Sequence, residues 1–361
     1  MKIILLFVLF FMPQIHAQGT ISEEYQYDLY RGRVIEVNEK TVVEDEQKTV
    51  IQEAKVKILN RDFKDQTVTI TNTLTGDPIY DMPLHDGSYV TIHYEENNFY
   101  FIGYDNTRPL IILLSIFLLS LIVIGGIKGV KALLALTITV SLIIGIMIPL
   151  LLRGINPILA SIFVCALATV ITFSIIAGIN KKSLSATIGT TGGLILGGLI
   201  AYSFSHFARL SGFSTNDASM LLYLPNAPLF DFRGLLFAGI IIGALGAAMD
   251  VAISIASALT ELQKENPNIT KANLIKAGFN IGRDVMGTMI NTLVLAYIGG
   301  TITMMLLFVG FQTSFYHLIN LDFVATEVVR AVTGSIGLLF AIPLTIFAFV
   351  TISWRKHEKT N

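Results

Sequence analysis

One stretch of this chain sets an ionisable side chain in a long apolar background. The run from Leu235 to Leu259 is long enough to cross a bilayer, and Asp250 is its single ionisable residue. Small and polar residues recur around it in steps of three and four, which places them on one stripe of a helix: Gly239, Gly243, Gly246, Asp250, Ser254, Ser257 and Glu261. A carboxylate at membrane depth is costly, so we expect Asp250 to face protein or water, where it could exchange a proton. The alternative is a structural aspartate held by hydrogen bonds from a neighbouring helix.

A second polar face follows on the next apolar segment, where Asp284, Thr288, Asn291 and Thr292 share one side of a helix. The two segments are expected to run antiparallel. Counted from their inner ends, Asp250 and Asn291 should then reach similar depth, so that Asn291 could donate a hydrogen bond to Asp250. The pattern predicts a proton or substrate pathway formed by these four residues together with Asp250 and Ser254.

Two other patterns favour helix packing rather than chemistry. Gly189, Gly193 and Gly197 recur every four residues, and Gly239, Gly243 and Gly246 line the stripe of Asp250, so both sets predict close helix contacts. Glu327 and Arg330 are spaced as an i,i+3 pair, which we interpret as a plain ion pair near the outer end of the last span. The glycine stripes would suit contacts within one bundle or between two copies, and the sequence leaves both open.

The composition identifies a polytopic α-helical membrane protein. Of 361 residues, 53% are hydrophobic and only 14% are charged, against about 25% charged in a soluble domain. The single cysteine, Cys165, excludes an intrachain disulfide, and no Cys/His spacing typical of a metal site is present. No catalytic motif appears either. Asp250 and Asp284 could in principle form an aspartyl pair, but their flanking residues do not support it. We therefore expect neither an enzyme nor a cofactor.

The chain order predicts four parts. Residues 1–17 are typical of a signal peptide, or of a signal anchor if they are not cleaved. Residues 18–108 hold about five short runs of strand-like alternation separated by turn signals, which predicts a small extracellular β-barrel-like domain. It has no basic cluster in sequence, so nucleic acid is not an expected partner, whereas an exported protein is a candidate. Residues 109–353 form the transmembrane domain, and 354–361 a cytoplasmic tail.

Seven spans are predicted in the transmembrane domain. Basic residues gather in every second connection and after the last span, which places the β domain outside and the C-terminus in the cytoplasm. A signal-like N-terminus demands the same orientation. The spans cover about 109–126, 132–152, 157–179, 184–206, 234–259, 286–309 and 327–353.

The block from Gly243 to Ile253, then Glu261, then the block from Gly282 to Leu293, resembles the YibE/F family of membrane proteins, as does the layout of an exported β domain before a multi-span bundle. The resemblance covers nearly the whole chain. It implies this architecture and a bacterial plasma membrane, with the bilayer itself as a partner, but it does not imply an activity.

A local similarity points to a mechanism. Gly246 and Asp250 followed by Thr288 and Thr292 are similar to a stretch of the resistance-nodulation-division superfamily, in which a glycine-rich helix carries a proton-relay aspartate. That similarity implies that Asp250 carries protons in an ion-coupled transporter or exporter. The small exported domain and the different number of spans depart from that superfamily. The alternative hypothesis is a non-transporting envelope accessory protein whose β domain binds an exported partner.

Overall fold

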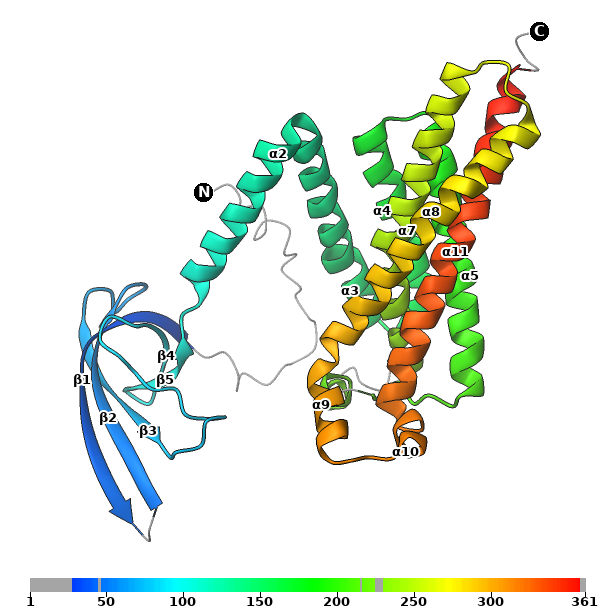
Figure 1. Cartoon of the computed structure of the whole chain (residues 1–361). Helices are drawn as coiled ribbons and strands as arrows, with labels where there is room; N and C mark the ends of the chain where they lie inside the picture. The colour runs from blue at the N-terminus through cyan, green and yellow to red at the C-terminus, as the bar shows by residue number, and fades with distance from the viewer. Residues whose placement is uncertain (1–27, 45–46, 215, 225–229, 358–361) are drawn as a thin grey trace. The chain divides into compact units, whose positions relative to one another are not determined.

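The computed structural model describes residues 28–44, 47–214, 216–224 and 230–357. The predicted signal segment lies outside the described residues, as do residues 358–361 of the predicted tail. The described chain falls into two compact units that divide after Val123. The first is a β domain that continues into the start of a helix, and the second is helical (Figure 1). Each unit has its own hydrophobic core.

The β domain is a five-stranded antiparallel sheet with strand order β3-β2-β1-β4-β5. The outermost strands, β3 and β5, also contact each other, so the sheet curls into a half-barrel (Figure 1). This confirms the predicted antiparallel β domain. The strands are β1 (Asp28–Glu44), β2 (Gln47–Ile58), β3 (Thr67–Leu74), β4 (Tyr89–Glu95) and β5 (Asn98–Tyr104).

Alternation of side chains explains why these segments are strands. In β3 the threonines at 67, 69, 71 and 73 are exposed, while Ile70 between them is buried. The buried side of the sheet ends in an aromatic cluster in which the rings of Phe63 and Phe99 lie 5.4 and 5.9 Å from the ring of Tyr30. Edge-to-face contacts of this kind close one side of the core and leave the other face of the sheet free for polar residues.

The helical unit consists of long apolar helices. Within the described residues, five helical stretches are long and apolar enough to cross a membrane, and a sixth candidate is a pair of helices bent by 60°. The five are 107–152, α4 (Pro157–Ala177), α5 (Lys181–Phe207), α7 (Phe232–Glu265) and α11 (Asp322–His357), and the bent pair is α8 (Lys271–Gly300) with α9 (Ile302–Gly310). Short turns complete the unit: α6 (Asn216–Met220), η3 (Leu221–Tyr223) and α10 (Phe315–Ile319).

The count of candidate spans differs from the predicted seven because the first two predicted spans lie in one helical stretch. It comprises α2 (Thr107–Leu142), the π-helical turn η2 (Ile143–Met147) and α3 (Ile148–Leu152). Gly126 interrupts α2 with φ 52° and ψ −134°, a conformation that glycine adopts without a Cβ clash. Gly126 is also the residue at which the first predicted span ends.

A second difference concerns the segment before the sixth predicted span. The sequence predicts a short helix over Lys271–Phe279 with Thr270 as its N-cap. Thr270 does cap a helix there, and its hydroxyl accepts a hydrogen bond from the backbone N–H of Asn273 at 3.3 Å. The helix does not stop at Phe279, however, but continues to Gly300 as α8. Gly278 and Gly282 pack against Ile346 and Ile342 of α11. This packing stabilises the helical conformation beyond Phe279, where the sequence is more polar. The predicted short helix and the sixth span are therefore one element.

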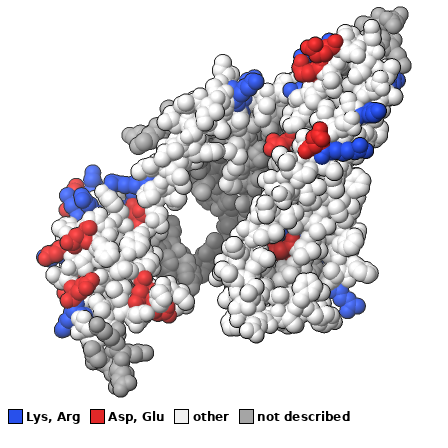
Figure 2. All heavy atoms as spheres, in the orientation of Figure 1, with Lys and Arg blue, Asp and Glu red and all other residues white. Residues whose placement is uncertain are grey.

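The core of the helical unit surrounds α7. This helix packs against α4, α5, α8 and α11, and buries Val251, Ala252, Ile255 and Leu259 completely. Figure 2 shows a broad uncharged surface on this unit with few charged side chains, as expected for a surface that faces hydrocarbon.

Candidate functional site

The stripe of α7 that carries Asp250 lies on the surface of the helical unit. Gly239, Gly243, Gly246, Asp250 and Ser254 are all exposed in the single chain, while residues on the other faces of the helix are buried. A Cβ added to Gly239 or Gly246 would meet nothing within 4 Å, so neither glycine packs against another described helix. The stripe is continuous, as the spacing predicts, and among the described helices only α8 approaches it, where Tyr297 lies against Gly243.

The predicted polar residues of α8 are exposed as well. Asp284, Thr288, Asn291 and Thr292 lie on the outer side of that helix, and only Leu293 among their neighbours is buried. The two threonine hydroxyls donate to their own helix: Thr288 Oγ1 to the carbonyl of Val285 and Thr292 Oγ1 to the carbonyl of Thr288, each at 2.9 Å. Their hydrogen-bonding capacity is thus partly used inside α8.

Contacts at two levels fix the register of α7 and α8. Gly282 faces Ile255, since a Cβ there would lie 3.7 Å from Cδ1 of Ile255. More than three turns toward the other end, Gly243 faces Tyr297, whose hydroxyl would lie 2.6 Å from such a Cβ. The helices are antiparallel, and Asp250 lies between these two contacts. So do Thr288 and Asn291, which places all three residues in the same part of the helix pair.

The expected hydrogen bond from Asn291 to Asp250 is not formed. Within the described part of the chain, the Asp250 carboxylate has neither a hydrogen-bond donor nor a basic partner. Both side chains are exposed on the surface of the helix pair. Two exposed side chains can lie at the same depth on neighbouring helices and still be too far apart to form a hydrogen bond. The structural alternative, an aspartate tied to a neighbouring helix of the same chain, is likewise not what the structure shows. What the arrangement offers is an unpaired carboxylate beside a polar helix face.

The predicted ion pair is formed in the helical unit. Arg330 Nη1 donates to Glu327 Oε1 at 2.8 Å, and the two side chains are 26% and 15% exposed. The hydroxyl of Tyr297 lies within electrostatic reach of both charges. Sequence reasoning missed Tyr297 and also Thr326, whose side chain is fully buried. A tyrosine within an apolar span could have indicated a polar cluster there, because its buried hydroxyl needs a polar partner.

Tyr297, Thr326, Glu327 and Arg330 form a polar cluster in which several atoms lack hydrogen-bond partners. Among the described residues, the buried atoms without a hydrogen bond include Tyr297 Oη, Thr326 Oγ1, Glu327 Oε2 and Arg330 Nε. Buried polar groups of this kind are usually satisfied by ordered water. The cluster is therefore a place inside the helical unit where water would be stabilised.

The small residues of α5 make the closest helix contact of the unit. Gly193 faces the carbonyl oxygen of Gly337 on α11, and Gly197 faces the Cα of the same residue, at 2.5 and 2.9 Å from an added Cβ. One turn further along, Gly189 packs directly on Thr345. Glycines at these three positions allow the two backbones to approach each other.

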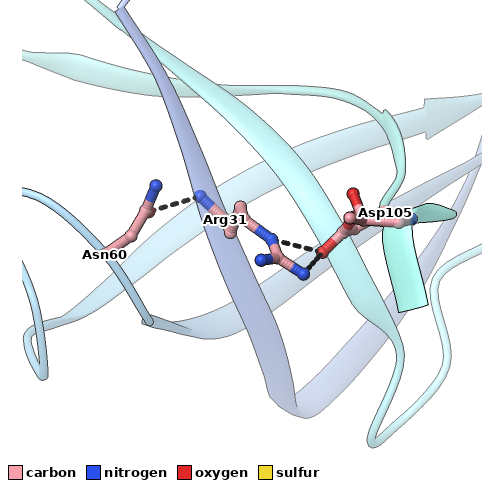
Figure 3. Close-up of polar contacts among 4 residues, drawn as sticks. Arg31, Asn60 and Asp105 are labelled. Carbon is pink, nitrogen blue, oxygen red and sulfur yellow. Dashed lines mark hydrogen bonds and ion pairs between the residues drawn. The ribbon is translucent and has the colours of Figure 1, made fainter. Parts of the chain in front are cut away.

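In the β domain, an ion pair between Arg31 and Asp105 has a buried carboxylate and a partly exposed guanidinium group. Arg31 of β1 donates from Nε and Nη2 to Asp105 Oδ2 at 2.7 and 2.6 Å, and Asn60 accepts from the backbone N–H of Arg31 (Figure 3). Asp105 also accepts from the N–H of Thr107, the first residue of α2, at 3.0 Å. Burial alone would raise the pKa of Asp105, but the hydrogen bonds from Thr107 and the Arg31 guanidinium hold it below its usual value.

No group of three or more His, Cys, Asp or Glu side chains that could hold a metal ion occurs within the described ranges. Comparison with protein families matches two parts of the chain. Residues 113–355 match the family described as YibE/F-like protein, and residues 25–103 match the one described as YibE/F family N-terminal domain. Searches of curated proteins and of solved structures found no match.

Proposed function

The chain belongs to the YibE/F family, and on that premise we propose that it is an ion-coupled membrane transporter or exporter in which Asp250 takes up and releases a proton. The observation that carries the proposal is the position of this carboxylate. It is exposed on a helix whose other faces are buried in the core, and no group in the described residues pairs with it. An acid that is already bonded could not easily serve as a carrier.

The surroundings of Asp250 support a hydrated route. An ionised carboxylate facing hydrocarbon costs about 2.5–3.5 kcal/mol even by the lowest estimates, so the exposed stripe needs water, a polar solute or protein against it. The outer side of α8 adds Asp284, Thr288 and Asn291 in the same part of the helix pair. Two adjoining polar helix faces are what a water-filled pathway requires, whereas a surface in contact with acyl chains would be apolar.

The proposal includes seven crossings, with the β domain outside and the C-terminus in the cytoplasm of a bacterial plasma membrane. The first helical stretch has 46 residues and would be about 70 Å long if straight, more than twice a hydrocarbon core of about 30 Å. Gly126 interrupts it, which supports two crossings in place of one. The bent pair α8 and α9 supplies a further span. Basic connections then lie on the cytoplasmic side.

Proton flux in proteoliposomes tests the proposal directly. The purified chain is reconstituted with an internal pH-sensitive dye, and a potassium diffusion potential is imposed. Asp250→Asn should insert and fold normally but lose potential-driven proton flux, because the amide cannot carry a proton. Asp217→Asn, on the exposed α6, removes an acid elsewhere and should leave the flux unchanged. Equal flux in the wild-type chain and in Asp250→Asn would reject the role of this carboxylate.

A second candidate function is favoured by the β domain. Tyr100, Ile102 and Tyr104 are exposed on β5, the edge strand, at 45%, 45% and 39%. An edge strand with exposed large side chains can add a strand from another protein. The chain would then be an envelope accessory protein that binds an exported partner and does not transport.

The two functions differ in what they require. Deletion of residues 18–108 should abolish the cellular phenotype of an accessory protein, while Asp250→Asn should be mild. A transporter should show the opposite ranking in proton flux.

The glycine stripe of α7 could instead be covered by a second copy of the chain. In that case Gly246→Leu would disrupt a dimer, and light scattering in detergent would detect the change.

A further inference from the structure

A cavity of about 450 Å³ is lined by residues of β4, the end of β5 and the first turns of α2. Its walls change in character along the helix. Thr91 of β4, Asn106 and Thr107 supply polar groups at one end, and Leu110, Ile111 and Leu114 supply an apolar wall at the other. All of these residues belong to the first unit of the chain. A polar end that continues into an apolar trough fits an amphiphile.

The polar end is bordered by basic side chains. Arg33 and Tyr89 are paired across β1 and β4, as are Arg31 and Thr91, so the four side chains share the outer face of the sheet. Arg108, in the first turn of α2, lies over the ring of Tyr89 with its guanidinium carbon 4.1 Å from the centroid, and that of Arg33 lies at 5.8 Å. The ring thus holds two guanidinium groups beside the cavity.

These two guanidinium groups are not neutralised. Arg31 is paired with Asp105, and Lys57, the neighbour of Arg33 on β2, is paired with Asp65 at 2.9 Å. Within the described residues, neither Arg33 nor Arg108 has a carboxylate partner, and both are exposed. Figure 2 shows basic side chains on the β domain. The one carboxylate of the cavity lining, Asp105, is neutralised by Arg31, so the two guanidinium groups leave an excess of positive charge beside it. Such a charge beside a partly apolar cavity is complementary to an anionic head group that carries an apolar tail.

The helix that forms the apolar wall is suited to contact lipid. The most apolar part of the stretch 107–152 contains no buried residue, and Leu110 and Leu114 are 61% and 46% exposed. A helix this apolar and this uncovered places its side chains among acyl chains, with its first turn at the head-group level. The polar end of the cavity would then meet phosphate groups, and the trough would continue along an acyl chain.

We propose that this cavity binds one anionic phospholipid, with its phosphate between Arg33 and Arg108 and an acyl chain along Leu110, Ile111 and Leu114. The site lies outside the Asp250 stripe and does not depend on transport. It depends only on the β domain, on the first turns of α2 and on a bilayer around them. Bound lipid would hold the β domain close to the membrane surface.

Native mass spectrometry of the full-length protein in detergent tests the proposal. The chain is titrated separately with dioleoyl phosphatidylglycerol, dioleoyl phosphatidylcholine and glycerol 3-phosphate. We expect one phosphatidylglycerol to be retained at concentrations at which phosphatidylcholine is lost. The double variant Arg33→Gln/Arg108→Gln should bind phosphatidylglycerol about twentyfold to thirtyfold more weakly, since each basic group near an anionic head group contributes several-fold. Lys64→Gln removes one charge elsewhere on the domain and should bind as the wild-type chain does.

Other outcomes would overturn the proposal. Equal retention of phosphatidylcholine would show that charge is not recognised. Binding of glycerol 3-phosphate as tight as that of phosphatidylglycerol would show a site for free phosphate and not for lipid. Ile111→Ser should weaken phosphatidylglycerol binding, and an unchanged affinity would exclude the acyl trough. If the double glutamine variant unfolds, Arg33→Lys/Arg108→Lys keeps both charges but loses the stacking on Tyr89, and it should bind lipid with intermediate affinity.

Discussion

Gly193 of α5 and Gly337 of α11 pack backbone against backbone, because a Cβ on Gly193 would lie only 2.5 Å from the carbonyl oxygen of Gly337. The nearest atoms are the main chain of Gly337 and Ala341 and the Cβ of Ala341, none of which can move away by changing rotamer. We therefore expect Gly193→Leu to separate the two helices and to lower the free energy of unfolding by about 1–3 kcal/mol, as overpacking does elsewhere. Thermal unfolding in detergent, followed by circular dichroism, measures the loss.

Gly299→Ala is the matched control for this variant. Gly299 is also a helical glycine, but an added Cβ would meet nothing within 4 Å. Alanine should be neutral or slightly stabilising there, since glycine in a helix is less favourable by about 1 kcal/mol. If Gly193→Leu melted at the same temperature as Gly299→Ala, the close approach of α5 and α11 would be disproved.

How far the sequence predicts the structure depends on whether a feature is local. The four-residue spacing of Gly189, Gly193 and Gly197 shows that one side of a helix is small, which is a property of the helix alone. The identity of its partner, α11, depends on how all the helices pack together, and no local pattern encodes that. The predicted strands were recognisable for the same local reason, because alternation such as that around Ile70 lies within one strand.

The candidate site shows where such reasoning fails. The spacing around Asp250 predicted one continuous stripe, but small residues suit both a packed face and an open polar face. The stripe on α7 proved open, whereas the one on α5 is packed. Arg33 and Arg108 are 75 positions apart in the numbering of the chain and become neighbours only through Tyr89, so no basic cluster was visible in the sequence.

Asp105 couples β1 to the start of α2, and its replacement should weaken that connection. Asp105→Asn leaves the Arg31 guanidinium without its anion and removes a charge-assisted acceptor from the Thr107 N–H. The expected loss is about 2 kcal/mol, the usual range for hydrogen bonds to charged groups, because Arg31 is 39% exposed and water compensates in part. Hydrogen exchange of the β1 amides in the full chain would report it.

The same ion pair predicts a pH dependence. The folded-state pKa of Asp105 lies below its usual value, so its contribution to stability is complete above the unfolded pKa of about 3.9 and is lost as the pH falls through the lower folded value. The stability difference between the wild-type chain and Asp105→Asn should therefore be constant near neutral pH and shrink only below about pH 4. A difference that disappeared already at pH 6 would mean that another group titrates.

Gly32 lies in β1 where a side chain has no room. A Cβ there would overlap Cγ1 of Val56 on β2, and both residues are inside the half-barrel core. Gly32→Ala should therefore displace Val56 and destabilise the β domain by about 1–3 kcal/mol. Gly103 on β5 is the control, since its nearest neighbour would be Met82 Sδ at an ordinary 3.8 Å. Gly103→Ala should be close to neutral, and proteolysis of the β domain would separate the two variants.

Cys165 provides a direct measure of how tightly the helical unit is packed. It is the only cysteine of the chain, it is 2% exposed, and it belongs to a buried cluster with Leu194 of α5 and Leu245 of α7, the two helices that α4 packs against. A thiol in that position reacts with maleimide only when the helices open, so labelling of the folded chain in detergent should be at least about a hundredfold slower than in denaturant. Thr71→Cys, on the exposed side of β3, should label at the rate of a free thiol. Gly193→Leu should speed the labelling of Cys165, because it displaces α5, which is one of the helices that cover the thiol. Rapid labelling of Cys165 in the native chain would contradict the packing of α4 against α5 and α7.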